Sequence, residues 1–149
     1  MFKKLFIIFV LSSVWQSLFC QTLENNCPKS LTYFAYTLPI DGNKWYTPIK
    51  YEIQNDLIEL KILNKEKDEL FIRFKIVENL ICDFKNTDNC NLKYKILTYD
   101  EETDSYEQRV SEIEFKFSDG KGKIYIQHPN FPLITSDATS IDKAQKSIQ

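Results

Sequence analysis

The cysteines have the most distinctive chemistry in this 149-residue chain. Cys20 lies in an apolar N-terminal run, and Cys27, Cys82 and Cys90 follow it. In a protein that leaves the cell, such cysteines are expected to form disulfide bonds. A zinc site has less support, because there is no CxxC pair and the single histidine, His128, is distant in the sequence.

The spacing of the last two cysteines predicts a Cys82–Cys90 disulfide. They bracket the turn-forming residues 86–89, so a bridge would close a short connection between strands. Such a bridge would stabilise the fold by about 2–3 kcal/mol. Cys27 is then free, bonded to another chain, or paired with Cys20 if processing leaves Cys20 in place. The alternative is Cys27 bonded to Cys82 or Cys90.

Other residues that could support catalysis or bind a metal do not form a recognised pattern. His128 would have to serve any Ser-His-Asp or Cys-His arrangement, but neither GxSxG nor HExxH occurs. The acidic loop 100–104 lacks the Gly and Glu of a calcium loop, because Ser105 and Ser111 occupy the sixth and twelfth positions. Acidic residues fall in loops or on polar strand faces, so no buried carboxylate pair is nominated. We therefore expect no catalytic residue, metal or cofactor.

Residues 1–20 read as a signal peptide. Lys3 and Lys4 precede an apolar run from Leu5 to Leu11, the pattern of a secretory signal. A membrane anchor is the alternative, but polar residues interrupt the second half of the segment, at Ser12, Ser13, Gln16 and Ser17. We expect a secreted, extracellular protein that begins at Gln21 and does not insert into a membrane once the signal is removed.

Charge argues against two classes of partner. Removal of residues 1–20 takes away Lys3 and Lys4, which moves the formal charge from −2 to −4. Nucleic acids and anionic membrane surfaces both require clustered basic charge, so neither is an expected partner.

Apolar and polar residues alternate along much of the remaining chain, the pattern of half-buried antiparallel strands. Clear alternation occurs over residues 58–62, 70–76, 92–96, 113–117 and 124–126, and weaker strands are expected at 31–40 and 45–53. The sequence predicts an all-β fold, an antiparallel sandwich or small barrel of about seven to eight strands. Residues 21–134 form this single domain, and 135–149 are a polar tail, flexible or with one short helical turn.

Charge pairing indicates a register for the first clear hairpin. Placing Ile62 opposite Leu70 sets Glu59 opposite Arg73, whereas a slip of two residues sets two cations opposite each other. In this arrangement the apolar positions point inward, including Phe74, as do Tyr94 and Phe115 on later strands.

Trp45 and Tyr46 are the candidate contacts for a ligand or partner. They follow Gly42 and open a predicted strand, which resembles the Gly-x-Trp start of lipocalins, secreted barrels that carry apolar ligands. The resemblance covers about five residues, and here Gly and Trp are one residue further apart. It implies an eight-stranded barrel with a ligand cavity.

Two functions follow from these patterns. The first is a secreted, non-enzymatic domain that binds an extracellular protein or other surface partner. The alternative is a lipocalin-like carrier of a small apolar ligand. The inward positions hold mostly large side chains, so we expect a filled core, which favours the first.

Overall fold

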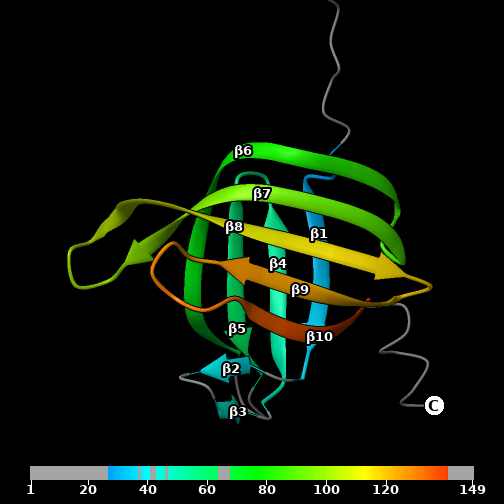
Figure 1. The fold of residues 1–149 in the computed structure, drawn as a ribbon, viewed down its shortest axis with the longest axis horizontal. Helices are drawn as coiled ribbons and strands as arrows, with labels where there is room; N and C mark the ends of the chain where they lie inside the picture. The colour runs from blue at the N-terminus through cyan, green and yellow to red at the C-terminus, as the bar shows by residue number, and fades with distance from the viewer. Residues whose placement is uncertain (1–26, 37, 41–42, 46, 64–67, 141–149) are drawn as a thin grey trace, which may run out of the picture.

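The chain folds into a closed, eight-stranded antiparallel barrel in a computed structural model (Figure 1). The structure describes residues 27–36, 38–40, 43–45, 47–63 and 68–140. None of these residues belongs to a helix that could cross a membrane. The strands are β1 (Ser30–Ala35), β2 (Leu38–Ile40), β3 (Asn43–Trp45), β4 (Ile49–Gln54), β5 (Leu57–Ile62), β6 (Glu69–Asn86), β7 (Asn89–Asp100), β8 (Ser105–Ser118), β9 (Lys121–Gln127) and β10 (Ile134–Ser140).

Sequential strands are neighbours around most of the barrel. Strands β4 to β10 form a meander in chain order, and β1 closes it by pairing with β4 on one side and β10 on the other. Strands β2 and β3 form a separate two-stranded sheet between β1 and β4 in the sequence. The expected all-β fold is confirmed, and its form is a barrel.

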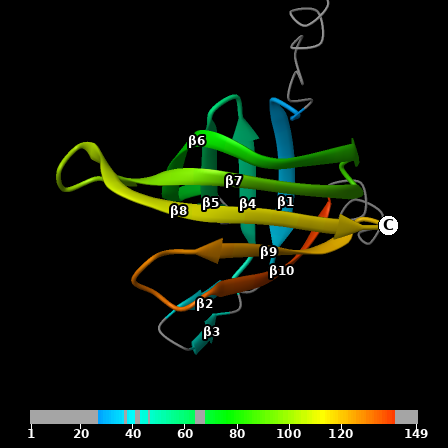
Figure 2. The ribbon, with the colours of Figure 1, turned by 45° about the horizontal axis from the view of Figure 1, so that its top comes forward.

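The two ends of the barrel differ in their connections. At one end, two-residue turns join β4 to β5, β6 to β7 and β8 to β9. The third turn uses Asp119 and Gly120, which both have positive φ, as a tight hairpin requires. At the other end the connections are longer, and Figure 2 shows β2 and β3 at that end.

Alternating residues fill the barrel interior, as the pattern predicts. Phe74, Tyr94 and Phe115 are all buried. The Phe115 ring lies among three tyrosine rings, with centroids 5.5 Å from Tyr33, 6.2 Å from Tyr51 and 6.3 Å from Tyr94. The contacts with Tyr33 and Tyr51 cross the interior from β8 to β1 and β4, and Tyr94 lies on the neighbouring strand β7, so large side chains occupy the space at this level.

The register of the β5–β6 hairpin follows the predicted charge pairing in part. Glu59 lies opposite Arg73, and the Arg73 Nε and Nη2 atoms each lie 3.0 Å from Glu59 Oε1. A bulge between Leu60 and Lys61 then shifts the register by one residue. Ile62 therefore lies opposite Glu69, and the predicted pairing of Ile62 with Leu70 is wrong.

The last barrel strand lies in the segment that the sequence analysis assigned to a polar tail. Strand β10 covers Ile134–Ser140, so the predicted domain end at residue 134 is wrong; residues 141–149 lie outside the described part. Its inward residues are small but buried: Ser136, Ala138 and Ser140. Ser140 lies opposite Tyr33, and Ser136 lies beside the Tyr51 hydroxyl. Small side chains fit here because neighbouring strands supply large rings.

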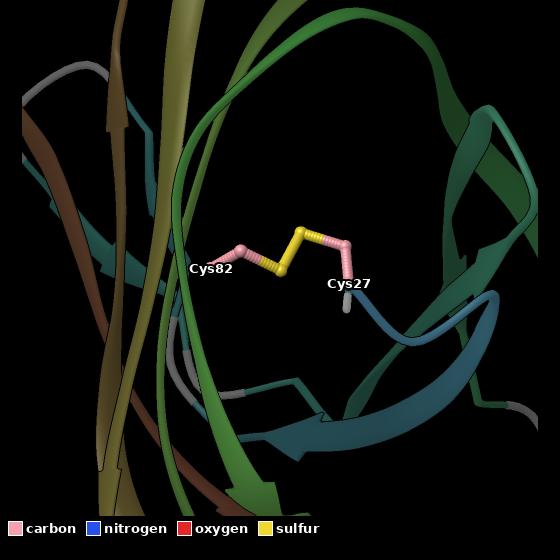
Figure 3. The surroundings of a disulfide bond; sticks show 2 residues. All are labelled: Cys27 and Cys82. Carbon is pink, nitrogen blue, oxygen red and sulfur yellow. A yellow bond between two sulfur atoms is a disulfide. The ribbon is translucent and has the colours of Figure 1, made fainter. Parts of the chain in front are cut away.

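The disulfide joins Cys27 to Cys82, with Cα atoms 5.4 Å apart (Figure 3). The predicted Cys82–Cys90 bridge is wrong, because the strands continue to a two-residue turn instead of leaving a loop between the cysteines. Cys90 lies opposite Phe84, and Cys82 lies opposite Leu92. The Cys27–Cys82 bond ties the segment before β1 to β6. A disulfide fits an oxidising compartment.

Cys90 is the free cysteine within the described residues. Its thiol shares a 3.1 Å hydrogen bond with the Tyr33 hydroxyl, inside the barrel. Burial raises the pKa of the Cys90 thiol, against the lowering effect of its hydrogen bond with Tyr33. Both effects of burial, a raised pKa and loss of access, make the thiol a poor nucleophile.

We expect Cys90 to resist alkylation in the native protein. At pH 8.5, iodoacetamide should modify it at least about tenfold more slowly than in urea-unfolded protein, because the reacting thiolate is both scarce and shielded. Peptide mass analysis over time measures the modification at this residue. Equal rates in the two states would show that Cys90 is accessible and would contradict its placement in the core.

Candidate functional site

Trp45, one of the two predicted contact residues, does not lie in the barrel wall. Trp45 ends β3 and pairs with Leu38 of β2, in the small separate sheet. Tyr46 lies outside the described residues. The first barrel strand is instead β1, which begins at Ser30. The segment whose Gly and Trp resemble the lipocalin start therefore follows the first barrel strand and does not form it.

The single histidine has local contacts. His128 Nε2 lies 3.7 Å from a carboxylate oxygen of Glu107, and its ring lies 4.8 Å from the Phe131 ring. Among the described residues, no group of three or more His, Cys, Asp or Glu side chains could hold a metal ion.

The acidic loop forms a turn held by its own side chains. Asp100 accepts hydrogen bonds from the Glu102 backbone and the Thr103 hydroxyl, both at 2.9 Å. Both bonds lower the pKa of Asp100, and the bond from the Thr103 hydroxyl has the larger effect. Asp104 accepts a hydrogen bond from the Tyr99 hydroxyl, which raises the pKa of Tyr99. The loop thus caps a hairpin, and the carboxylates of Asp100 and Asp104 are engaged in the turn.

This hairpin projects from the barrel. Strand β7 last pairs with β6 at Thr98, and β8 first pairs with β9 at Glu112. Residues Tyr99–Ser111, which we call the arm, are therefore paired only within the β7–β8 hairpin among the described strands. Figures 1 and 2 both show the arm extending beyond the ends of the neighbouring strands.

One face of the arm carries aromatic rings with cations above them. Tyr99 and Tyr106 lie opposite each other, with ring centroids 5.3 Å apart and planes at 67°. The Arg73 guanidinium carbon lies 5.7 Å from the Tyr99 centroid, and Lys75 Nζ lies 5.9 Å from the Tyr106 centroid. Both distances are within the range of cation–π attraction. Together with Val110 these four residues form what we call the arm face.

The two cations of the arm face are not equivalent. Arg73 is held by Glu59, which neutralises its charge. Lys75 has no ion pair among the described residues, so its charge is open to a partner. The register places Leu97 opposite both Lys75 and Val110. Val110 is 43% exposed, so apolar surface continues beside the rings.

The arm face is suited to binding rather than to chemistry. Val110 is exposed and the two tyrosine rings are half-buried on the projecting hairpin, and grouped apolar surface of this kind marks interaction sites. Tyr and Arg are also the residue types enriched at the centres of protein interfaces. The sequence patterns did not indicate this face, although two tyrosines flank the acidic turn.

Comparisons with protein families, with curated proteins and with solved structures find no match to this chain. Function is therefore inferred from the geometry of the molecule.

Proposed function

We propose that this chain is a secreted, non-enzymatic binding protein that holds an extracellular protein on the arm face. The observation that supports this proposal is the arrangement of Tyr99 and Tyr106 on the projecting arm, with Arg73 and Lys75 above their rings. The N-terminal signal pattern and the Cys27–Cys82 disulfide support export to an oxidising compartment.

The arm face determines the chemistry of the partner. Val110 and the two rings offer an apolar centre, so the partner presents an apolar or aromatic side chain there. Of the two cations of the arm face, Lys75 has no ion pair with a described residue, so the partner places a carboxylate opposite it. Glu59 already neutralises Arg73, which orients that side chain over Tyr99. This combination of an apolar centre and a charged rim is typical of protein interfaces.

A lipocalin-like carrier of a small apolar ligand is the second candidate. The closed eight-stranded barrel favours it, because barrels of this size can enclose one small ligand. The rings around Phe115 occupy the middle of the interior, and this is why we rank surface binding first.

Loss of the tyrosine rings tests the proposal. We expect labelled protein to bind saturably to the outer surface of cells of the source organism. The Tyr99→Ala/Tyr106→Ala variant should bind at least about 30-fold more weakly, because the loss of even one central aromatic contact of about 2 kcal/mol lowers affinity by that factor. Binding isotherms on intact cells measure the effect.

Tyr125→Ala is the matched control, because Tyr125 is a cation-facing tyrosine on β9, outside the arm. It should bind like the wild type. Treatment of the cells with protease should abolish binding if the partner is a protein. Equal binding by the arm variant and the wild type, or survival of binding after protease, would refute the proposal.

A further inference from the structure

Strand β6 leaves an opening in the barrel wall beside the disulfide. Its pairing with β5 ends at Lys75, although the strand continues to Asn86. In the same region its pairing with β7 is irregular, with one register shift between Ile76 and Glu78 and another between Asn79 and Ile81. Paired irregularities of this kind bend a strand and are common next to functional sites.

The opening contains a hollow of about 340 Å³. This volume lies within the range of small-molecule sites, roughly 300–1,000 Å³. Its lining comes from the segment before β1, the β4–β5 turn, β6 and β7: Cys27, Pro28, Lys29, Asn55, Asp56, Ile76, Asn79 and Tyr94. Figure 3 shows the disulfide crossing from β6 to the segment before β1, which forms one side of this region.

Backbone hydrogen bonds fix the rim of the hollow. The Asn55 amide donates to the Lys29 carbonyl at 2.6 Å, and the Ile76 amide donates to the Asp56 carbonyl at 2.6 Å. These bonds tie the β4–β5 turn to both neighbouring segments, and the disulfide holds the remaining side. The hollow is therefore part of the fold and is largely preformed, as ligand sites usually are.

Tyr94 is the most deeply buried residue that lines the hollow. Its side chain is 1% exposed, and its hydroxyl has no hydrogen-bond partner among the described residues. Burial raises the pKa of Tyr94 to about 12, so the hydroxyl stays neutral and keeps its proton to donate. Buried polar groups in folded proteins usually have a partner. Five other buried side-chain polar atoms of the described part also lack one, but Tyr94 is the residue among the six that lines the hollow.

We propose that the hollow binds a small, neutral, mainly apolar molecule whose single hydroxyl or carbonyl group pairs with the Tyr94 hydroxyl. Ile76, Pro28 and the disulfide provide apolar contact for the body of the molecule. At the rim, Lys29 and Asp56 carry opposite charges, which gives no net preference for an ion. This site is separate from the arm face and does not depend on the protein partner proposed above.

Paired probes that differ by one hydroxyl group test the proposal. p-Cresol is expected to bind the oxidised protein saturably with a dissociation constant of roughly millimolar, as its few atoms allow. Toluene, which lacks the hydroxyl, should bind about three- to tenfold more weakly. Titrations followed by the NMR signals of Ile76 and Tyr94 measure both affinities and locate the site.

Three variants decide the outcome. Tyr94→Phe should reduce the affinity for p-cresol to that for toluene without changing toluene binding. Asn79→Trp should fill the hollow and abolish binding of both probes. Tyr106→Phe, on the arm face, should change neither. No saturable binding of p-cresol, or equal affinity in wild type and Tyr94→Phe, would overturn the proposal.

Discussion

Replacing Phe115 with alanine is expected to lower the free energy of unfolding by about 3–5 kcal/mol. The Phe115 side chain is fully buried, and its ring is within 6.3 Å of the rings of Tyr33, Tyr51 and Tyr94. These rings belong to three other strands, fixed by their own pairing, so they cannot collapse into the vacated space. The substitution therefore removes apolar contact and leaves a cavity. Urea denaturation monitored by circular dichroism measures the loss.

Phe131→Ala is the matched control, because it deletes the same atoms from a loop where the side chain is 63% exposed. It should change the free energy of unfolding by less than about 0.5 kcal/mol. Similar small effects from both substitutions would mean that Phe115 does not lie at the centre of a packed interior. That result would also favour a ligand cavity in the barrel interior, and with it the carrier function.

Removing the disulfide is expected to lower the free energy of unfolding by about 4 kcal/mol. The bond joins Cys27 to Cys82, which are 55 residues apart, so it restricts a long loop in the unfolded chain. Replacing both cysteines with serine frees that loop. The urea midpoint of the Cys27→Ser/Cys82→Ser variant measures the effect.

Reducing agent supplies the control for this substitution. It should lower the urea midpoint of the wild type to that of the double variant and leave the variant unchanged. A non-reduced peptide map should show Cys27 bonded to Cys82. A map with Cys82 bonded to Cys90, or a double variant as stable as the oxidised wild type, would contradict this assignment.

Alternation predicted the strands whose inward residues are large and apolar. Residues 58–62 and 113–117 show it clearly, and they lie in β5 and β8. Alternation did not predict strand β10, because Ser136 and Ser140 are small and polar, although both are buried. These serines are buried because Tyr33 and Tyr51, on other strands, are large. The β10 segment itself contains no pattern that would indicate this.

The disulfide predicted from the cysteine spacing was wrong for a different reason. A short separation indicated that Cys82 and Cys90 are neighbours, but it could not show how far the strands on either side extend. Strand β6 continues through Cys82 to Asn86, so the turn contains only two residues. The partner of Cys82 comes from the segment before β1, which meets β6 only when the barrel closes. Long-range closure of this kind is a property of the whole topology.

The candidate sites were also beyond the sequence patterns. Tyr99 and Tyr106 are recognisable only once the register places them opposite each other, away from the barrel neighbours of their strands. Tyr94 was correctly predicted to point inward. Its unpaired hydroxyl, and the hollow that Tyr94 lines beside the irregular part of β6, are not revealed by alternation.

The position of β1 has a consequence for how the barrel assembles. Strands β4 to β10 are consecutive hairpins, so each can form from contacts local in the sequence. Strand β1 must pair with β10, at the far end of the chain, and this closure has a high entropic cost. Cys27 lies just before β1, and its bond to Cys82 keeps the closing strand near the meander. An oxidising environment during folding therefore favours the closed barrel over an open, aggregation-prone sheet with two unpaired edges.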